Sequence, residues 1–287
     1  MKILILGASG MLGNAAFRIL SAEPRLTTYG TARSDNIRRH FPSPLQSRLV
    51  IGVDVLDIDS LLGIMQRIRP DAILNCIGVI KQLCTAKDPL VALPLNALLP
   101  HRLARAAALS GTRLIHISTD CVFSGSAGSY TEASVPDADD LYGRSKLFGE
   151  VDYPNAITLR TSIIGRELGT RNGLLEWFLS AETPIRGFTR AIFSGLPTDE
   201  FARVIVRHVL PRPELTGVWH VSANPISKYD LLLLLRDAYG REVRIDPDSS
   251  TVIDRSLDST RFRAATGYDP PSWPELIANM RTFAEAA

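Results

Sequence analysis

Three glycines between residues 7 and 13 restrict the fold more than any other feature of the sequence. They follow an apolar run, Lys2–Leu6, and open an amphipathic stretch, Met11–Ala22. Glycines there permit a tight turn, close approach of the backbone to a pyrophosphate and close packing of helix on strand. The N–H groups and dipole of the helix N-terminus attract phosphate. The pattern predicts a nucleotide-binding strand–turn–helix unit that uses Gly7, Ser9, Gly10, Met11, Leu12 and Gly13.

Short apolar runs alternate with helical patterns through the first half of the chain. The runs are nearly continuous in aliphatic and β-branched residues, as expected of strands buried on both faces of a parallel sheet. We therefore predict an α/β fold with a doubly wound Rossmann sheet. The predicted strands are Lys2–Leu6, Thr27–Thr31, Leu49–Val53, Ala72–Cys76, Leu114–Ser118 and Ala156–Arg160, and the predicted helices are Met11–Ala22, Ile58–Arg67 (with Asp57 or Asp59 as cap), Asn96–Leu109 and Leu141–Glu150.

The composition excludes several classes of protein. The 287 residues carry a formal net charge of +2, which gives no ground for a nucleic-acid partner or an anionic membrane partner. The leucine run Leu231–Leu235 is too short to span a bilayer, and Met1 leads directly into a strand pattern rather than a signal peptide. The histidines and cysteines lack the spacing of metal ligands. We expect a cytoplasmic protein without a metal site.

The residues after the second predicted strand indicate the cofactor. An Asp or Glu that binds the ribose of NAD is expected there, but the sequence has Arg33 and Ser34. The Arg33 guanidinium can bind a 2′-phosphate through charge-assisted hydrogen bonds, and Ser34 can add another. A solvated surface arginine is the alternative. We predict NADP(H) as the cofactor.

The pattern becomes less regular after about Gly165. Helices are predicted at Leu174–Leu179, Asp199–Val209, Lys228–Tyr239 and Trp273–Ala284. We expect residues 1–165 to form an NADP-binding Rossmann domain and residues 166–287 a smaller C-terminal substrate-binding domain. The late run Gly217–Ser222 is predicted to return to the main sheet as a strand.

Tyr142 and Lys146 are separated by one helical turn, so both side chains face the same cleft. Thr119 ends the preceding strand, at the edge where open α/β sheets bind ligands. A structural tyrosine beside a solvated lysine is the alternative. Asn96 is either a supporting polar residue or a simple helix cap.

The GxxGxxG spacing together with Thr119, Tyr142 and Lys146 resembles the extended branch of the short-chain dehydrogenase/reductase family. The resemblance implies that all three are catalytic residues: Tyr142 donates a proton to a ketone oxygen, Lys146 lowers the pKa of Tyr142 and binds the cofactor ribose, and Thr119 orients the substrate. It also implies that Asp54 and Val55 meet the adenine, while Cys76, Ile77 and Gly78 line the path to the nicotinamide.

Three segments resemble the dTDP-4-dehydrorhamnose reductase family more closely: Ser118–Gly125, Tyr142–Glu150 and Leu159–Ser162. The resemblance covers nearly the whole chain. It implies NADPH-dependent reduction of a 4-keto-6-deoxy nucleotide sugar for surface polysaccharide precursors, and it leaves a homodimer open. The implied substrate-binding residues are Asp120, Val122, Phe123, Ile163, Asn172 and Pro197.

Three departures from the family pattern concern the substrate walls. Cys121 replaces a common tyrosine, Ile163 replaces a tryptophan, and Phe193-Ser194 replaces a polar pair. Reductase chemistry is therefore better supported than any particular sugar. Two alternatives remain: a nucleotide-sugar epimerase, and a non-catalytic NADP-binding regulatory subunit like that of methionine adenosyltransferase.

Overall fold

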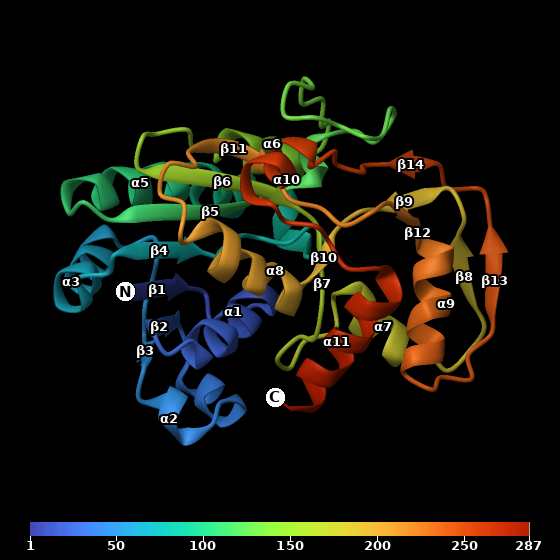
Figure 1. Ribbon diagram of the computed structural model, residues 1–287, viewed down its shortest axis with the longest axis horizontal. Helices are drawn as coiled ribbons and strands as arrows, with labels where there is room; N and C mark the ends of the chain where they lie inside the picture. The colour runs from blue at the N-terminus through green and yellow to red at the C-terminus, as the bar shows by residue number, and fades with distance from the viewer. Residues whose placement is uncertain (287) are drawn as a thin grey trace.

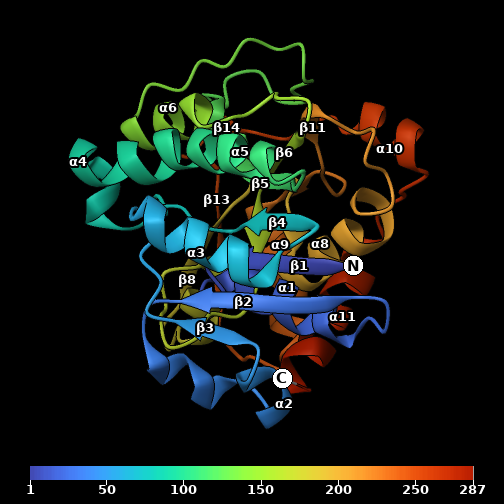
Figure 2. The ribbon, with the colours of Figure 1, turned by 90° about the vertical axis from the view of Figure 1, so that its left-hand side faces the viewer.

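A seven-stranded parallel sheet forms the centre of the protein, whose computed structural model describes residues 1–286. The strand order is β11-β6-β5-β4-β1-β2-β3, which confirms the predicted doubly wound Rossmann fold. Figure 2 shows β5, β4, β1, β2 and β3 one beside the next. The strands are β1 (Lys2–Leu6), β2 (Thr27–Ala32), β3 (Leu49–Ile51), β4 (Ala72–Asn75), β5 (Arg113–Thr119), β6 (Ala156–Thr161) and β11 (Gly217–His220).

Successive residues of each strand point to opposite faces of the sheet, and each face has its own hydrophobic core. Ile3 and Ile5 of β1 belong to one core, with apolar residues of α1, α8 and α11. Leu4 and Leu6 belong to the other, with residues of α3 and α5. The main helices are α1 (Met11–Ala22), α3 (Ile58–Ile68), α5 (Leu99–Leu109), α6 (Leu141–Phe148), α8 (Thr198–Val204) and α11 (Trp273–Glu285).

The predicted helix Asn96–Leu109 begins earlier in the structure. Its chain enters as α4 (Pro89–Ala92), passes through a π-helical turn, η3 (Leu93–Leu98), and only then continues as α5. Pro94 and Pro100 each lack the N–H of a regular helical ladder, which favours an irregular turn between the two α segments. By contrast, Asp57 caps α3 as predicted, accepting hydrogen bonds from the N–H groups of Asp59 and Ser60.

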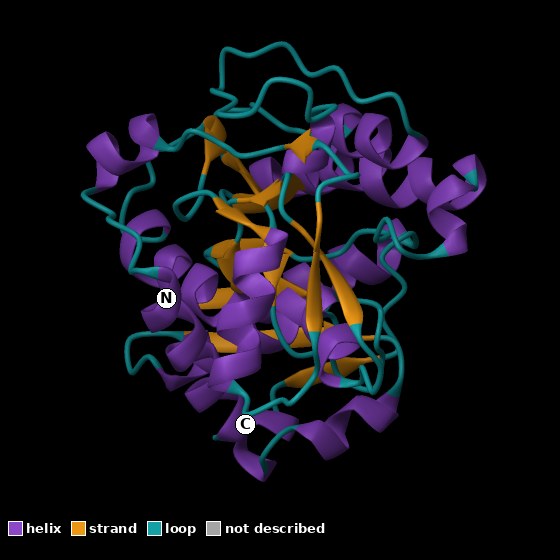
Figure 3. Cartoon of the chain, turned by 90° about the vertical axis from the view of Figure 1, so that its right-hand side faces the viewer, coloured by secondary structure: helices purple, strands orange, loops and turns teal. Residues whose placement is uncertain are grey.

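Smaller sheets lie on the right of Figure 1, together with α7 and α9, and Figure 3 shows the molecule from that side. Late in the chain, β11 pairs in parallel with β6 of the main sheet. No helix within residues 1–286 has the length and hydropathy needed to cross a membrane. The remaining elements are η1 (Asp35–His40), α2 (Ser43–Gln46), η2 (Cys84–Lys87), η4 (Asp120–Val122), β7 (Ile163–Ile164), α7 (Leu174–Leu179), β8 (Ile185–Phe188), β9 (Ala191–Phe193), β10 (Leu196–Pro197), η5 (Ile205–Val209), β12 (Ile226–Ser227), α9 (Lys228–Ala238), β13 (Ile245–Asp248), β14 (Ile253–Asp254) and α10 (Thr260–Thr266).

Candidate active site

The glycine turn between β1 and α1 is held by the neighbouring strand. The N–H of Gly7 donates to Oγ1 of Thr31 at 3.1 Å, and the N–H of Ala8 donates to the Thr31 carbonyl at 2.9 Å. Gly7 has a φ of +87°, and a Cβ at Gly13 would lie 2.0 Å from the Gly7 carbonyl oxygen. Both positions therefore require glycine. Thr31 was missed from the sequence because its role depends on which strand lies beside β1.

No side chain caps or neutralises the backbone N–H groups in the first turn of α1. Gly10 is the N-cap and offers no capping side chain, and the first turn contains no acidic residue. Ser9 and Gly10 are exposed, Met11 is half-buried, and Leu12 is buried. The positive end of the helix dipole and the N–H groups of this turn are therefore suited to an anion.

Residues after β2 and β3 meet at the same edge of the sheet. Ala32 pairs with Ile51, so the segments that contain Arg33 and Asp54 leave neighbouring strands. Both of these side chains are exposed, while Val55 packs on the core. Ser34 accepts a hydrogen bond from the N–H of Asn36, at 3.3 Å, which makes it the cap of η1.

Two glycines place α6 close to its neighbours. A Cβ at Gly143 would lie 2.3 Å from the Cys121 carbonyl oxygen, and one at Gly149 would lie 1.8 Å from that of Asn96. Asp140 caps the helix by accepting a hydrogen bond from the N–H of Gly143, at 2.7 Å. The close approach brings α6 against the turn that follows β5. This packing explains how the side chains of α6 reach Thr119.

The three predicted catalytic residues come together at this edge. The Thr119 side chain lies close enough to the Tyr142 hydroxyl to lower its pKa. The Thr119 hydroxyl also donates to Asp120 Oδ1 and accepts from the N–H of Cys121, both at 3.1 Å. Lys146 is buried, and its Nζ donates to the Ile117 carbonyl of β5 at 2.7 Å. Thr119, Tyr142 and Lys146 thus lie at one site, fixed by short contacts to β5.

The electrostatics of this site differ from the expected lowering of the Tyr142 pKa by Lys146. Burial raises the pKa of Tyr142 above its usual range, and the neighbouring Cys121 adds to the increase, while the Thr119 side chain acts in the opposite direction. Burial also lowers the pKa of Lys146 to about 8, although Glu150 favours its charged form. Desolvation therefore sets the direction of both pKa shifts. Tyr142 stays protonated at neutral pH, which suits a proton donor.

Asn96 links the segment after β4 to α6. Its Oδ1 accepts a hydrogen bond from the N–H of Val79 at 2.9 Å, and its Nδ2 donates to Ser145 Oγ at 3.1 Å. The side chain is buried within η3 rather than placed at a helix end, so the simple capping role is wrong. A Cβ at Gly78 would lie 3.1 Å from Asn96 Oδ1 and 3.8 Å from Lys146 Nζ. Glycine at 78 therefore keeps open the space beside Lys146.

Of the other predicted residues on the nicotinamide side, Ile77 packs on the turn, where a Cβ at Gly7 would lie 2.8 Å from its Cγ1. Cys76 is half-buried, and burial raises the pKa of its thiol. The backbone of this segment is fixed by Asn75, whose Oδ1 accepts a hydrogen bond from the N–H of Ile77 at 3.1 Å. The segment therefore lies between the glycine turn and Lys146.

A buried polar network lies at the C-terminal end of α6. Glu150 accepts hydrogen bonds from Ser118 Oγ at 2.7 Å and from Arg160 Nε at 2.8 Å, and its second oxygen lies 2.7 Å from Arg160 Nη2. Both charged side chains are about 95% buried, at 6% and 5% exposure. Arg160 also contacts Nε2 of His220 on β11, at 3.2 Å. Glu150 and Arg160 each belong to a motif that is visible in the sequence. Their pairing could not be predicted, because it depends on how the segment after α6 lies against β6.

The predicted substrate residues next to Thr119 differ in exposure. Asp120 is buried, and desolvation raises the pKa of its carboxyl group. Val122 and Phe123 are fully buried in a small core, where Phe123 stacks on Tyr130 with ring centroids 4.1 Å apart. Their side chains therefore face the interior rather than a ligand. Any contact with a sugar at these two positions would have to use the backbone.

Two other predicted substrate residues lie in one small sheet. Ile163 of β7 pairs with Leu196, and Pro197 of β10 pairs with Ile164. Gly195 permits this pairing, because a Cβ there would lie 2.3 Å from the Ser162 carbonyl oxygen. Ile163 is half-buried and Pro197 is buried.

Asn172 and Phe193 have different surroundings. Asn172 is exposed, and its N–H donates to Glu167 Oε2 at 2.8 Å. Phe193 is a core residue that packs on Trp273, with centroids 5.8 Å apart. We expected Phe193 to form part of an altered substrate wall, but its side chain is buried in the core, so this expectation is wrong for the side chain. The half-buried Ile163 is the better candidate for a contact with the substrate.

The strand order, the glycine turn and the arrangement of Thr119, Tyr142 and Lys146 define a Rossmann-fold protein of the extended short-chain dehydrogenase/reductase type. Within that class, the chain belongs to the family described as the RmlD substrate binding domain, which matches residues 1–282.

Similar proteins include reductases and a subunit of methionine adenosyltransferase 2. The chain is 25% identical to dTDP-4-dehydrorhamnose reductase of Aggregatibacter actinomycetemcomitans, over 99% of both proteins. It is 32% identical to methionine adenosyltransferase 2 subunit beta of Mus musculus, over 96% of this chain and 88% of that protein. The structure of dTDP-4-dehydrorhamnose reductase from Bacillus anthracis in complex with NADP superposes with a TM-score of 0.79, at 22% identity, over 98% of this chain and 97% of that one. This last similarity concerns the fold alone.

Proposed function

We propose that the protein is an NADPH-dependent reductase of a 4-keto-6-deoxy nucleotide sugar. The observation that carries this proposal is the joint position of Thr119, Tyr142 and Lys146 at the carboxyl edge of the sheet, next to a glycine turn shaped for a pyrophosphate. The similarity to the Aggregatibacter reductase supports it. Residues 1–165 together with β11 would bind the cofactor, and residues 166–287 would supply most of the substrate site.

The chain has groups suited to each part of NADPH. The first turn of α1, from Gly10 to Gly13, would bind the pyrophosphate through backbone N–H groups. The exposed Arg33 would bind the 2′-phosphate. Asp54 would lie toward the adenine, and Gly78 beside Lys146 would leave room for the nicotinamide ribose. When bound, NADPH supplies the hydride for ketone reduction.

The protein's own groups would complete the reduction. Tyr142 would donate its phenolic proton to the ketone oxygen, and its raised pKa keeps that proton in place until the oxygen becomes basic. Thr119 would hydrogen-bond the same oxygen and fix its position. Lys146 would be held against β5 by the Ile117 carbonyl, so its ammonium stays at the site while the substrate exchanges.

The substrate side of the site would be formed by Asp120 and by the β7–β10 pair. Ile163 is half-buried and pairs with Leu196, so it would offer an apolar contact to a deoxy sugar, while the buried Pro197 pairs with Ile164 and would support this wall from within. The exposed Asn172 would lie toward the nucleotide. A surface polysaccharide precursor is the product class that the resemblance suggests.

A non-catalytic regulatory subunit that binds NADP is the second candidate function. The 32% identity to the mouse methionine adenosyltransferase subunit favours it. The presence of Thr119, Tyr142 and Lys146 together argues for an enzyme. A subunit that only binds NADP would need Tyr142 and Lys146 for cofactor affinity alone and would not need a proton donor. An epimerase on the same scaffold remains the third alternative.

The decisive experiment follows NADPH oxidation with dTDP-, UDP- and GDP-4-keto-6-deoxy sugars in parallel. We expect turnover with at least one of them and release of NADP. A purified protein that retains NAD tightly would favour an epimerase. A protein that binds NADPH without oxidising it on any of these sugars would favour the regulatory subunit.

A further inference from the structure

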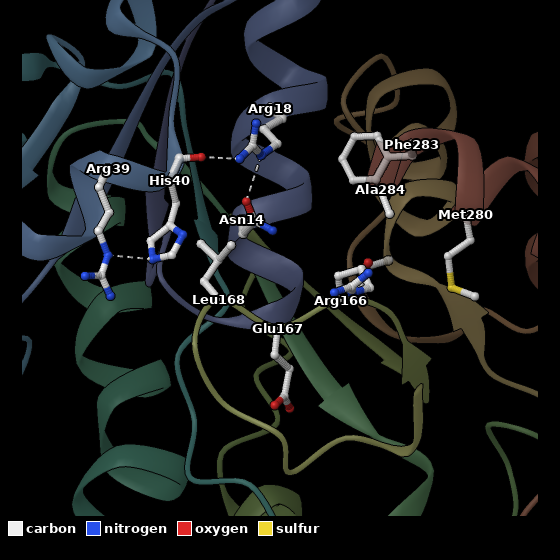
Figure 4. A pocket seen from close by; sticks show the side chains of 11 residues that line it. Asn14, Arg18, Arg39, His40, Arg166, Glu167, Leu168, Met280, Phe283 and Ala284 are labelled. Atoms are coloured by element: carbon white, nitrogen blue, oxygen red, sulfur yellow. Dashed lines mark hydrogen bonds between the residues drawn. The ribbon is translucent and has the colours of Figure 1, made fainter. Parts of the chain in front are cut away.

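A cavity lies beside α1, and neither Tyr142 nor Lys146 lines it. Its volume is about 360 Å³, within the range of small-molecule sites. In Figure 4, Arg39 and His40 of η1 stand on one side of the cavity and Arg166 and Met280 on the other, with Arg18 and Asn14 of α1 between them. None of these residues is assigned to the cofactor or the sugar in the proposed function.

Three arginines give the cavity a positive character. Arg18 is half-buried, and its contacts are neutral: Nε donates to Asn14 Oδ1 at 2.9 Å, Nη2 donates to the His40 carbonyl, and the guanidinium lies over the Phe41 ring. Burial without a carboxylate partner lowers the pKa of Arg18. A buried cation of this kind gains free energy when an anion binds beside it.

The other charged groups leave a positive surplus. Arg39 is exposed and donates Nε–H to Nε2 of His40 at 3.2 Å, which leaves its two terminal nitrogens for a ligand. Arg166 pairs with Glu176 through Nε, so its terminal nitrogens are likewise available. Glu167 is the one carboxylate among the lining residues, and it accepts from Thr170 and from the N–H of Asn172.

One wall of the cavity is apolar. The α11 residues Met280, Phe283 and Ala284 line it, and Leu168 adds an apolar side chain on the side of His40 (Figure 4). Inorganic phosphate alone would leave this wall without a partner. A ligand with both an anionic group and a flat apolar body would use both parts of the cavity.

We propose that this cavity is a binding site for an organic phosphate, with the phosphate between Arg18 and Arg39 and the apolar body against Phe283. Its lining residues differ from those proposed to bind the dinucleotide. Its floor is α1, and one wall is the loop at Arg166–Leu168, which follows β7. The inference goes beyond the proposed reductase function and does not depend on it.

The test measures binding of AMP by calorimetry to the full chain saturated with NADPH, with inorganic phosphate as a second probe. We expect AMP to bind alongside NADPH and more tightly than phosphate. Arg39 is exposed, so Arg39→Gln should not disturb the fold. It should weaken the binding of AMP at least tenfold, because a charge-assisted hydrogen bond is lost. Phe283→Ala should weaken the binding of AMP but not the binding of inorganic phosphate. Arg25→Gln, an exposed arginine outside the cavity, should change neither.

Several results would overturn the proposal. AMP that competes with NADPH would be occupying the dinucleotide site. Equal weakening by Arg25→Gln and Arg39→Gln would indicate attraction by the general surface charge. The absence of measurable AMP binding to the folded, NADPH-saturated protein would exclude the site. Binding is read directly, so the test is decided whether or not the protein reduces a sugar.

Discussion

Arg160 holds His220 in a single neutral tautomer at the junction of β6 and β11. Nδ1 of His220 lies 2.9 Å from the Tyr130 carbonyl oxygen, so Nδ1 carries the proton. Nε2 is then free to accept from Arg160 Nη1, at 3.2 Å. Since Arg160 also pairs with Glu150, one buried network joins β6 and β11 to the turn that follows α6.

This network predicts sensitivity to acid. Burial and the nearby Arg160 lower the pKa of His220 from 6.5 to about 4, so the unfolded chain binds a proton more readily than the folded protein between these values. The free energy of unfolding should therefore fall as the pH drops from 6.5 to 4, by on the order of 3 kcal/mol, and this group should have no effect above pH 7. Urea unfolding at several pH values measures it. His220→Gln should reduce the slope and leave the part due to the buried His116, whose pKa is also lowered by burial. His208→Gln should leave the slope unchanged; equal slopes in both variants would exclude His220 as a cause.

The fold was largely predictable because buried parallel strands and their helices have strong local patterns. The strand Lys2–Leu6 and the helix Met11–Ala22 have the predicted bounds. The small sheets were not predictable, since β7 and β10 are two residues long and exist through their pairing. At the site, spacing placed Tyr142 and Lys146 on one helical face. The pKa of Tyr142 was predicted in the wrong direction, because sequence does not report burial.

Arg33→Ala should weaken the binding of NADPH more than the binding of NADH. Only NADPH has the 2′-phosphate, and a charged hydrogen bond contributes about 1.5–3 kcal/mol, equivalent to tenfold or more in the dissociation constant. The side chain is exposed, so the variant should fold normally. Fluorescence titration with each cofactor measures the ratio. If both cofactors weaken equally, Arg33 does not bind the phosphate.

Ile163→Trp should change the relative rates among nucleotide sugars and leave NADPH affinity nearly constant. Ile163 is half-buried on β7 and pairs with Leu196 of β10, where a larger side chain would reshape the apolar wall. The measurement is kcat/KM for dTDP-, UDP- and GDP-linked substrates. An unchanged ranking, in a protein that still binds NADPH, would show that this position does not contact the sugar.

Lys146 should produce the basic limb of the pH profile. Its pKa is lowered to about 8 by burial, while the pKa of Tyr142 is raised, so Lys146 loses its proton first as the pH rises. If the ammonium is required, kcat/KM should fall as the pH increases through about 8. Lys146→Arg keeps the positive charge and should move this limb to higher pH in whatever activity remains. A limb that stays near pH 8 in Lys146→Arg would assign it to another group.

Tyr142→Phe should abolish most of the turnover while preserving the structure. The substitution removes one oxygen from a side chain of almost unchanged shape, and the glycine turn and Lys146 remain to bind the cofactor. Thr119 keeps its hydrogen bonds with Asp120 and Cys121 in this variant. General acid catalysis contributes about 10²–10⁴-fold, so kcat should fall by that order. Because the proton moves only as the transition state forms, NADPH affinity should change little.

Lys146→Ala provides the comparison for this variant. It should weaken NADPH binding as well as turnover, because Lys146 is proposed to bind the ribose in addition to supporting Tyr142. The two variants therefore separate loss of the proton donor from loss of the cofactor contact. The measurements are steady-state reduction of a confirmed 4-keto sugar and NADPH titration on each folded variant. Near-normal turnover by the folded Tyr142→Phe variant would show that Tyr142 is not the proton donor.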